Sequence, residues 1–277
     1  MTPKRTRVWI VGVVAIVVSF VVFLVPFAFV LLQAAKTPAE ASNLAFSWPT
    51  DWQFFPNLLE TLKSNDGVLW RAILNSSILT IVSVALMVVV SAMAGYVLAR
   101  KKSKWGPLVN FFVLAGLIVP PAVVPTIWVL KGLKLFGTMP GMILIEATFG
   151  LSFCILLFRA FVGNIPRELD EAAVLDGAGP VRLFLRVVLP LLRPVVVTVI
   201  VVQSVFVFND FAGPLYFLPG NHNVTVQLAL YTFSGQNLSF YNLLFMAIFL
   251  ITIPPLLAYI FFNRQIVAGM TSGAVKG

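Results

Sequence analysis

Residues 166–194 read PRELDEAAVLDGAGPVRLFLRVVLPLLRP and form a long polar interruption between apolar runs of the chain. Pro166 suits the first turn of a helix, because the N–H that proline lacks has no partner there. Negative charge is favoured in the same turn, which carries Glu168, Asp170 and Glu171. Gly177 is suited to ending this helix, and Pro180 to beginning another. The stretch therefore predicts two short helices outside the apolar runs.

The first of these helices, from about Arg167 to Asp176, carries a narrow stripe of mostly small side chains. The stripe follows the spacing i, i+3, i+4 and i+7 that puts residues on one helical face, and it consists of Leu169, Ala172, Ala173 and Asp176. A short acidic helix with such a face suits docking into a groove of another protein. The same residues also fit a solvated loop between two longer helices.

The second helix has an apolar face and a basic face. The apolar face consists of Leu183, Phe184, Val187, Val188 and Leu191. The opposite face carries Arg182, Arg186 and Arg193. This pattern indicates a helix that lies at a membrane surface, with its arginines reaching lipid phosphates.

Composition places the chain in a membrane. Of 277 residues, 60% are hydrophobic and only 10% are charged, against roughly 25% charged in a soluble domain. Apolar runs of about 20 residues are long enough to cross a bilayer as helices. The net charge of +9 does not indicate a nucleic-acid partner, because the basic residues lie mainly in the segments between and beside the apolar runs. The single cysteine, Cys154, lies in an apolar run and excludes a disulfide framework. We expect one all-helical, polytopic membrane domain.

Six spans are predicted, at about 8–32, 73–99, 107–129, 139–161, 194–212 and 241–262. The polar loop then covers 164–192, and residues 263–277 form a tail. The first run is too long for the apolar core of a signal peptide, so we expect it to be retained. Pro120, Pro121 and Pro125 predict that the third span is broken where it faces protein or a cavity. The pair Pro254-Pro255 predicts an interruption of the sixth span.

The distribution of Lys and Arg predicts the orientation. With the N-terminus inside, five of the 19 basic residues lie outside, namely Lys36, Lys63, Arg71, Lys131 and Lys134, and all others lie inside. Because basic residues are enriched on the cytoplasmic side, both termini and the 164–192 loop are predicted to be cytoplasmic.

The loop resembles a motif of a known family. Glu171-Ala172-Ala173, Gly177 four residues later and an apolar stretch ending in Leu189-Pro190 resemble the cytoplasmic coupling loop of ATP-binding-cassette importer permeases. One departure is the family's usual Ile before Leu-Pro, where this chain has Val187-Val188. The resemblance implies a type I importer permease fold in which the ATPase is contacted by Glu168, Leu169, Glu171, Ala172, Ala173, Asp176 and Gly177.

The end of the chain, Gly269 to Gly277, resembles the tail of the second permease subunit of maltose-type sugar importers. This resemblance implies a further ATPase contact through Ser272, Gly273 and Lys276. The alternative is a frayed terminus, as is common at chain ends.

The resemblance also implies an assembly in a bacterial or archaeal cytoplasmic membrane. Its parts are a second homologous permease, two cytoplasmic ATPase subunits and an external solute-binding protein. The expected solute is a sugar or related polyol, carried by alternating access. Membrane lipid is the remaining partner, and no cofactor is implied.

No catalytic constellation is present in the sequence. There is one histidine, His222, and no phosphate-cradling Gly-x-x-x-x-Gly-Lys loop. We therefore expect a transport subunit without an ATPase site or a metal site of its own, which takes its energy from a partner.

Two acids lie inside apolar runs, Glu146 and Asp210. A charge at the bilayer centre costs at least roughly 2.5–3.5 kcal/mol, so such residues usually face a cavity or a partner. We predict that Glu146 lines the substrate pathway or pairs with another subunit. Asp210 is closer to a span end, where a structural role also fits. Gln203, Asn209 and Gln227 offer neutral hydrogen bonds for sugar hydroxyls, and aromatic faces are available from Phe206, Phe208, Phe211 and Tyr216.

Three alternatives remain open on the residues alone. The first is an importer of another solute class, because importers of amino acids, phosphate, metals or peptides share the loop motif. A secondary transporter or channel needs internal repeats and midplane ionisable residues, and the sequence shows no clear repeat. A membrane-embedded enzyme lacks a paired acid and base, and is the least favoured.

Overall fold

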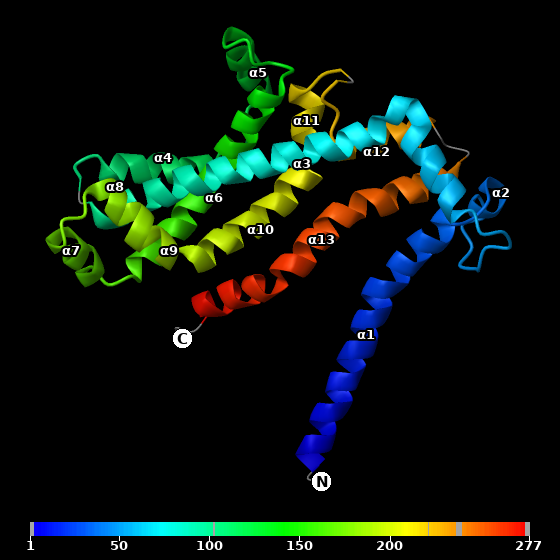
Figure 1. The fold of residues 1–277 in the computed structure, drawn as a ribbon, viewed down its shortest axis with the longest axis horizontal. Coiled ribbons are helices and arrows are strands. Elements are labelled where there is room, and N and C mark those ends of the chain that lie inside the picture. Colours follow the sequence, from blue (N-terminus) through cyan, green and yellow to red (C-terminus); the bar gives the residue numbers. More distant parts are fainter. Residues whose placement is uncertain (1–2, 102, 221, 237–239, 275–277) are drawn as a thin grey trace. The chain divides into compact units, whose positions relative to one another are not determined.

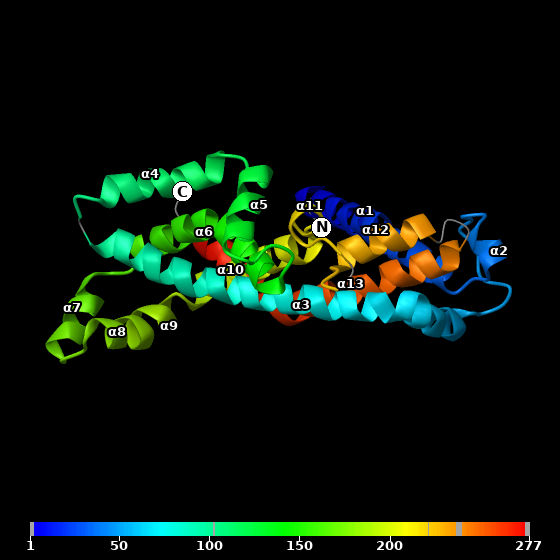
Figure 2. The ribbon, with the colours of Figure 1, turned by 90° about the horizontal axis from the view of Figure 1, so that it is seen from above.

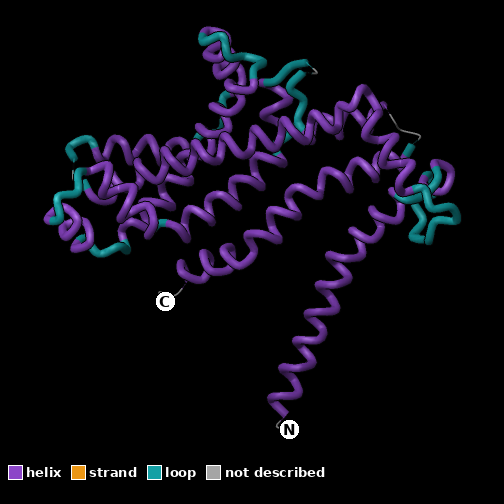
Figure 3. The backbone as a smooth tube through the Cα atoms, viewed as in Figure 1, coloured by secondary structure: helices purple, strands orange, loops and turns teal. Residues whose placement is uncertain are grey.

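The computed structural model describes residues 3–101, 103–220, 222–236 and 240–274, and in these ranges the backbone is helix or loop (Figure 3). The long helices are α1 (Pro3–Ala34), α3 (Phe54–Arg100), α4 (Gly106–Ile118), α5 (Val123–Gly132), α6 (Met139–Gly163), α10 (Arg193–Asn209), α12 (Val226–Gln236) and α13 (Tyr241–Ala274). The short ones are α2 (Pro38–Ala41), α7 (Glu168–Leu175), α8 (Pro180–Leu183), the π-helix η1 (Phe184–Val188), α9 (Leu189–Leu191) and α11 (Ala212–Phe217).

The described helices provide four to six candidate membrane spans. Four helical stretches are long and apolar enough on their own: Val11–Ala34, Asp66–Arg100, Met139–Gly163 and Tyr241–Phe261. Two bent pairs, α4 with α5 and α8–α9 with α10, qualify if each pair counts as one span. The predicted all-helical polytopic class is confirmed.

The prolines of the third predicted span break it as expected. Between α4 and α5 the chain bends by 116°, and Pro120 and Pro121 lie in the non-helical linker. Pro125 falls in the first turn of α5, where its missing N–H leaves no helical hydrogen bond unmade.

The predicted interruption at Pro254-Pro255 was wrong. Helix α13 continues through both residues. Proline holds φ near the helical value, so the pair removes backbone hydrogen bonds without forcing the chain to turn. In apolar helices, neighbouring groups can satisfy the carbonyls that are released.

The chain divides into two compact units, and the first comprises Met1–Trp70 and Ala229–Pro254. The buried Asn57 joins three helices of this unit. Its Nδ2 donates to the carbonyl oxygens of Ala34 (2.9 Å) and Lys36 (2.8 Å), and its Oδ1 accepts from Asn242 Nδ2 (2.9 Å). The end of α1 and the starts of α3 and α13 are therefore tied by amide hydrogen bonds, which lipid cannot replace.

The second unit comprises Arg71–Leu228 and Pro255–Gly277, and it contains the main hydrophobic core. Helices α3 and α6 approach closely at Gly95, where an added Cβ would lie 2.7 Å from Phe158 Cβ and 2.9 Å from the Arg159 amide nitrogen. Such small residues let helices pack backbone to backbone. Helices α7, α8 and α9 lie at the end of α3 that carries Arg100 (Figures 1 and 2).

Candidate functional site

Helix α7 lies in the first half of the polar loop. Its first turn holds the three acids, and no residue of the helix is buried. Gly177 follows with φ +78°, a left-handed conformation that glycine adopts without strain. The predicted helix and its stop signal both lie where the sequence placed them.

An ion pair fastens α7 to the end of α3. Arg100 Nε lies 2.7 Å from Asp170 Oδ2, and the two side chains are only 12% and 15% exposed. Arg100 Nη2 also donates to the carbonyl of Ile165 (2.9 Å), and the Tyr96 hydroxyl donates to Asp170 Oδ2 (3.5 Å). Charge-assisted bonds of this kind are stronger than neutral ones, so this network fixes the base of the helix.

Sequence reasoning missed this network. Arg100 belongs to a run of basic residues at a span end, and Asp170 to the acidic first turn of a helix, so each has a local explanation. Nothing in the sequence links two charges that are 70 positions apart.

Three of the four residues of the predicted stripe are exposed, namely Leu169, Ala172 and Asp176. Ala173 packs against the hydrophobic core of the second unit, whereas Leu169 is 42% exposed and Leu175 88% exposed. Four exposed residues at i, i+3, i+4 and i+7 form what we call the outer face of α7: Glu168, Glu171, Ala172 and Leu175. Asp176 and Gly177 are exposed just beyond the helix.

Most of the apolar face of the next segment packs against protein, so the predicted lipid contact of that face was wrong, whereas a contact of its arginines with lipid stays a prediction. Leu183 and Val188 are 7% and 1% exposed and belong to the core. The three arginines on the opposite side are exposed. Burial against the rest of the second unit accounts for an apolar face as well as lipid contact does, and sequence periodicity cannot separate the two.

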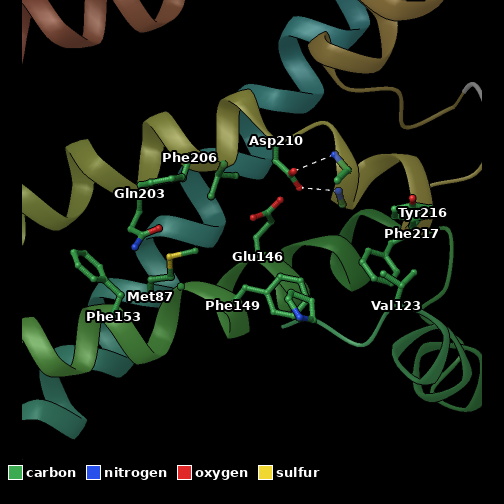
Figure 4. A pocket seen from close by; sticks show the side chains of 15 residues that line it. Met87, Val123, Glu146, Phe149, Phe153, Gln203, Phe206, Asp210, Tyr216 and Phe217 are labelled. Carbon is green, nitrogen blue, oxygen red and sulfur yellow. Dashed lines mark hydrogen bonds between the residues drawn. The ribbon is translucent and has the colours of Figure 1, made fainter. Parts of the chain in front are cut away.

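A cavity of about 600 Å³ forms a second candidate site within the second unit. Side chains from α3, α5, α6, α10 and α11 line it, among them Met87, Val123, Glu146, Phe149, Phe153, Gln203, Phe206 and Tyr216. Glu146 is 8% exposed and its Oε1 has no hydrogen-bond partner. Its carboxyl group points toward Asp210 (Figure 4). The cavity thus combines apolar walls with a small polar cluster, as is typical of small-molecule sites.

Asp210 has a structural partner as well as a place in the cavity wall. Its carboxylate accepts from the N–H groups of Ala212 (3.1 Å) and Gly213 (3.0 Å) at the start of α11 (Figure 4). A Cβ added at Gly213 would lie 2.2 Å from Asp210 Oδ2, so the glycine makes room for this cap.

The structure brings together three of the four predicted pathway residues: Glu146, Gln203 and Asp210 line the cavity. Asn209 does not line it, and instead its Nδ2 donates to the Val205 carbonyl (2.8 Å) while its Oδ1 accepts from Gln227 (3.1 Å). Phe206 and Tyr216 line the cavity, and Phe208 and Phe211 do not.

Two wall residues that were missed had a signal in the sequence. Phe149 and Phe153 follow Glu146 at i+3 and i+7, which places them on its helical face.

The predicted tail contact falls largely outside what can be described. Ser272 and Gly273 belong to α13 by backbone, and Lys276 lies outside the described residues.

Helices long and apolar enough to span a membrane, together with an exposed polar helix and a partly apolar cavity in the second unit, are the features of a membrane permease. Residues 91–272 match the family described as binding-protein-dependent transport system inner membrane component, and the chain belongs to this family. It is therefore a multi-pass inner-membrane permease subunit, not the subunit that hydrolyses ATP.

Curated relatives agree with this family. The chain is 32% identical over 260 residues to the diacetylchitobiose uptake system permease protein of Streptomyces coelicolor, covering 92% of this chain and 85% of that protein. It is 28% identical over its full length to the melibiose/raffinose/stachyose import permease protein of Bacillus subtilis, and covers 100% of that protein. The chain is also 34% identical over 211 residues to the trehalose transport system permease protein of Mycobacterium tuberculosis, and this match covers 74% of this chain and 77% of that protein.

The fold is shared with a solved transporter. A chain in the crystal structure of a bacterial ABC transporter involved in import of the acidic polysaccharide alginate superposes with a TM-score of 0.82 at 18% identity. The match covers 95% of this chain and 98% of that one. A second structure of a bacterial alginate ABC transporter, in complex with an alginate pentasaccharide-bound periplasmic protein, gives a TM-score of 0.66 at 16% identity over 95% and 94% of the two chains.

Proposed function

We propose that this chain is the permease subunit of an ATP-driven importer for a sugar or a related polyol. The observation that carries the ATP-driven part is α7, an exposed acidic helix held by the Arg100–Asp170 ion pair at one end of the second unit. The solute class rests on the relatives, whose names refer to diacetylchitobiose, melibiose, raffinose, stachyose and trehalose.

The proposed assembly contains a second, similar permease, two cytoplasmic ATPase subunits and an external solute-binding protein. Both termini and the 164–192 loop lie in the cytoplasm, as the distribution of basic residues favours. The outer face of α7 then docks in a groove of the ATPase. ATP can shift the permease between inward-open and outward-open states only if the ATPase holds this helix differently in its two states.

Within the permease, the cavity is part of the solute pathway. Glu146, Gln203 and Asp210 supply hydrogen bonds to hydroxyl groups, while Phe149, Phe153 and Phe206 supply apolar faces. Sugars present both kinds of surface, so the wall suits them. Asn209 is not part of this proposal, because it lies outside the cavity.

Charge reversal on α7 tests the coupling. In proteoliposomes holding the purified importer, Glu171→Lys places the wrong charge on the docking face. It should lower ATP-dependent sugar uptake by about tenfold, a coupling loss of the usual size for linked sites. ATP hydrolysis should persist. Glu171→Gln, which removes the charge without reversing it, should lose less. Normal uptake by the Glu171→Lys variant would refute the docking assignment.

The tail forms a second ATPase contact in this proposal, through Ser272, Gly273 and Lys276. Deleting the residues after Met270 should then weaken the association of the ATPase with the membrane subunits. Co-purification of the ATPase in mild detergent measures this directly. If the truncated chain retains its ATPase and hydrolysis remains coupled to uptake, the tail has no such role.

A further inference from the structure

A crevice of about 420 Å³ lies between the ends of α3 and α6 and the beginning of α4. Its wall is built from regular helical faces: Ala94, Val97 and Leu98 on α3, Val109 and Val113 on α4, and Ile155 on α6. These six side chains are apolar, and the crevice is separate from the solute cavity, with which it shares no lining residue.

Two cationic side chains stand at one end of this apolar wall. Lys101 directly follows the last residue of α3, and Arg159 is one helical turn beyond Ile155 on α6. Arg159 Nη1 donates to Asn110 Oδ1, which orients a guanidinium group that has five N–H donors in all. Among the described residues that line the crevice, none is acidic, so no lining carboxylate neutralises the two cations.

Lys101 and Arg159 lie near the ends of the apolar stretches of α3 and α6. Lys101 is the first residue after the candidate span Asp66–Arg100. Trp105 also lines the crevice and is 70% exposed, and tryptophan favours the boundary between hydrocarbon and water. An apolar slot that opens beside two cations at this boundary has the layout of an acyl chain followed by a phosphate.

We propose that the crevice binds an anionic phospholipid, with an acyl chain along the apolar wall and its phosphate between Lys101 and Arg159. A neutral apolar ligand leaves both cations unpaired, and a free phosphate ion leaves the apolar wall unfilled. Basic pockets between helices at a membrane surface are suited to anionic head groups. Because Arg100 binds Asp170, the lipid lies at the base of α7, in the cytoplasmic leaflet if the topology proposed above holds.

Native mass spectrometry of the full-length chain, purified with its attached subunits and titrated with phosphatidylglycerol or phosphatidylcholine, tests this site. Lys101→Gln and Arg159→Gln should each weaken phosphatidylglycerol binding about fivefold, the effect expected of one basic residue near an anionic surface. The matched control is Lys134→Gln, an equal loss of charge at an exposed position after α5 that is not in the crevice. It should leave binding unchanged.

A space-filling variant identifies the part of the lipid that is bound. Val109 is 41% exposed in the crevice wall, and Val109→Trp should displace the acyl chain and abolish retention of phosphatidylglycerol. Inorganic phosphate at millimolar concentration should not displace lipid from the unaltered chain. Equal binding of the two lipids, equal losses in Lys101→Gln and Lys134→Gln, or full retention by Val109→Trp would each overturn the proposal. The readout is lipid mass, so such a failure leaves the import proposal standing.

Discussion

Asp170 and Arg100 link the loop helix to the membrane helices through one nearly buried ion pair. Removing one partner from such a pair leaves the other charge poorly solvated, which costs more than the pair itself contributes. The pair therefore determines where α7 sits more than it determines the stability of the whole chain. Met87, in the cavity wall, lies on the same helix as Arg100, so α3 connects the base of α7 with the proposed solute pathway.

We predict that Asp170→Asn reduces ATP-dependent uptake by about fivefold to 100-fold, the range of a typical coupling free energy. The chain should still assemble and ATP should still be hydrolysed, because the outer face of α7 is intact. Uptake and hydrolysis measured on the same proteoliposomes separate these effects.

The charge-swapped double variant, Arg100→Asp with Asp170→Arg, supplies the control. It restores opposite charges at the same two positions, so it should recover part of the uptake that is lost when Arg100→Asp or Asp170→Arg is made alone. If Arg100→Asp and Asp170→Arg each leave uptake normal when made alone, the ion pair does not position the coupling helix.

How much of the candidate site is predictable at this scale depends on the type of residue. Glu146 was predicted because an acid well inside an apolar run is costly unless it faces a cavity or a partner. Asn209 was predicted beside it for its polarity, which gives no direction, and its amide bonds Val205 and Gln227 instead of lining the cavity.

At the scale of helices, sequence predicts existence better than orientation. Proline and glycine placed the break of the third span and the end of α7, because both residues act on the backbone locally. The predicted stripe of α7 included Ala173, which packs on the core, because an eight-residue helix with mixed faces does not reveal which side packs on its own protein. The same ambiguity explains the burial of the α8–η1 apolar face.

Close packing of α3 on α6 gives a prediction at this scale. Gly95→Ala adds a Cβ 2.7 Å from Phe158 Cβ, and overpacking of this kind costs about 1–3 kcal/mol. The melting temperature of the detergent-solubilised chain should therefore fall. Gly163→Ala on α6 is the matched control, because an added Cβ there meets nothing within 4 Å. Equal melting temperatures for the two variants would contradict the close helix approach.

At the scale of the whole molecule, composition alone predicted the class. A chain with 60% hydrophobic and 10% charged residues has too little polar surface for a soluble fold, and its apolar runs are long enough to span a bilayer. The cavity was not predictable as a whole, because its walls come from helices between α3 and α11 whose packing is set by long-range contacts. The Glu171-Ala172-Ala173 motif indicated the importer family, and the match over residues 91–272 confirmed it.

Disulfide or bifunctional crosslinking from single cysteines on α7 tests most directly whether this helix is held by a separate ATPase. Ala172 and Leu175 lie on the outer face, whereas Ala173 packs inward. We predict that Ala172→Cys and Leu175→Cys crosslink to an ATP-hydrolysing subunit in the assembled importer and that Ala173→Cys does so far less. If neither outer-face cysteine captures such a subunit, or if the Ala173→Cys variant captures it equally well, α7 is not the coupling helix.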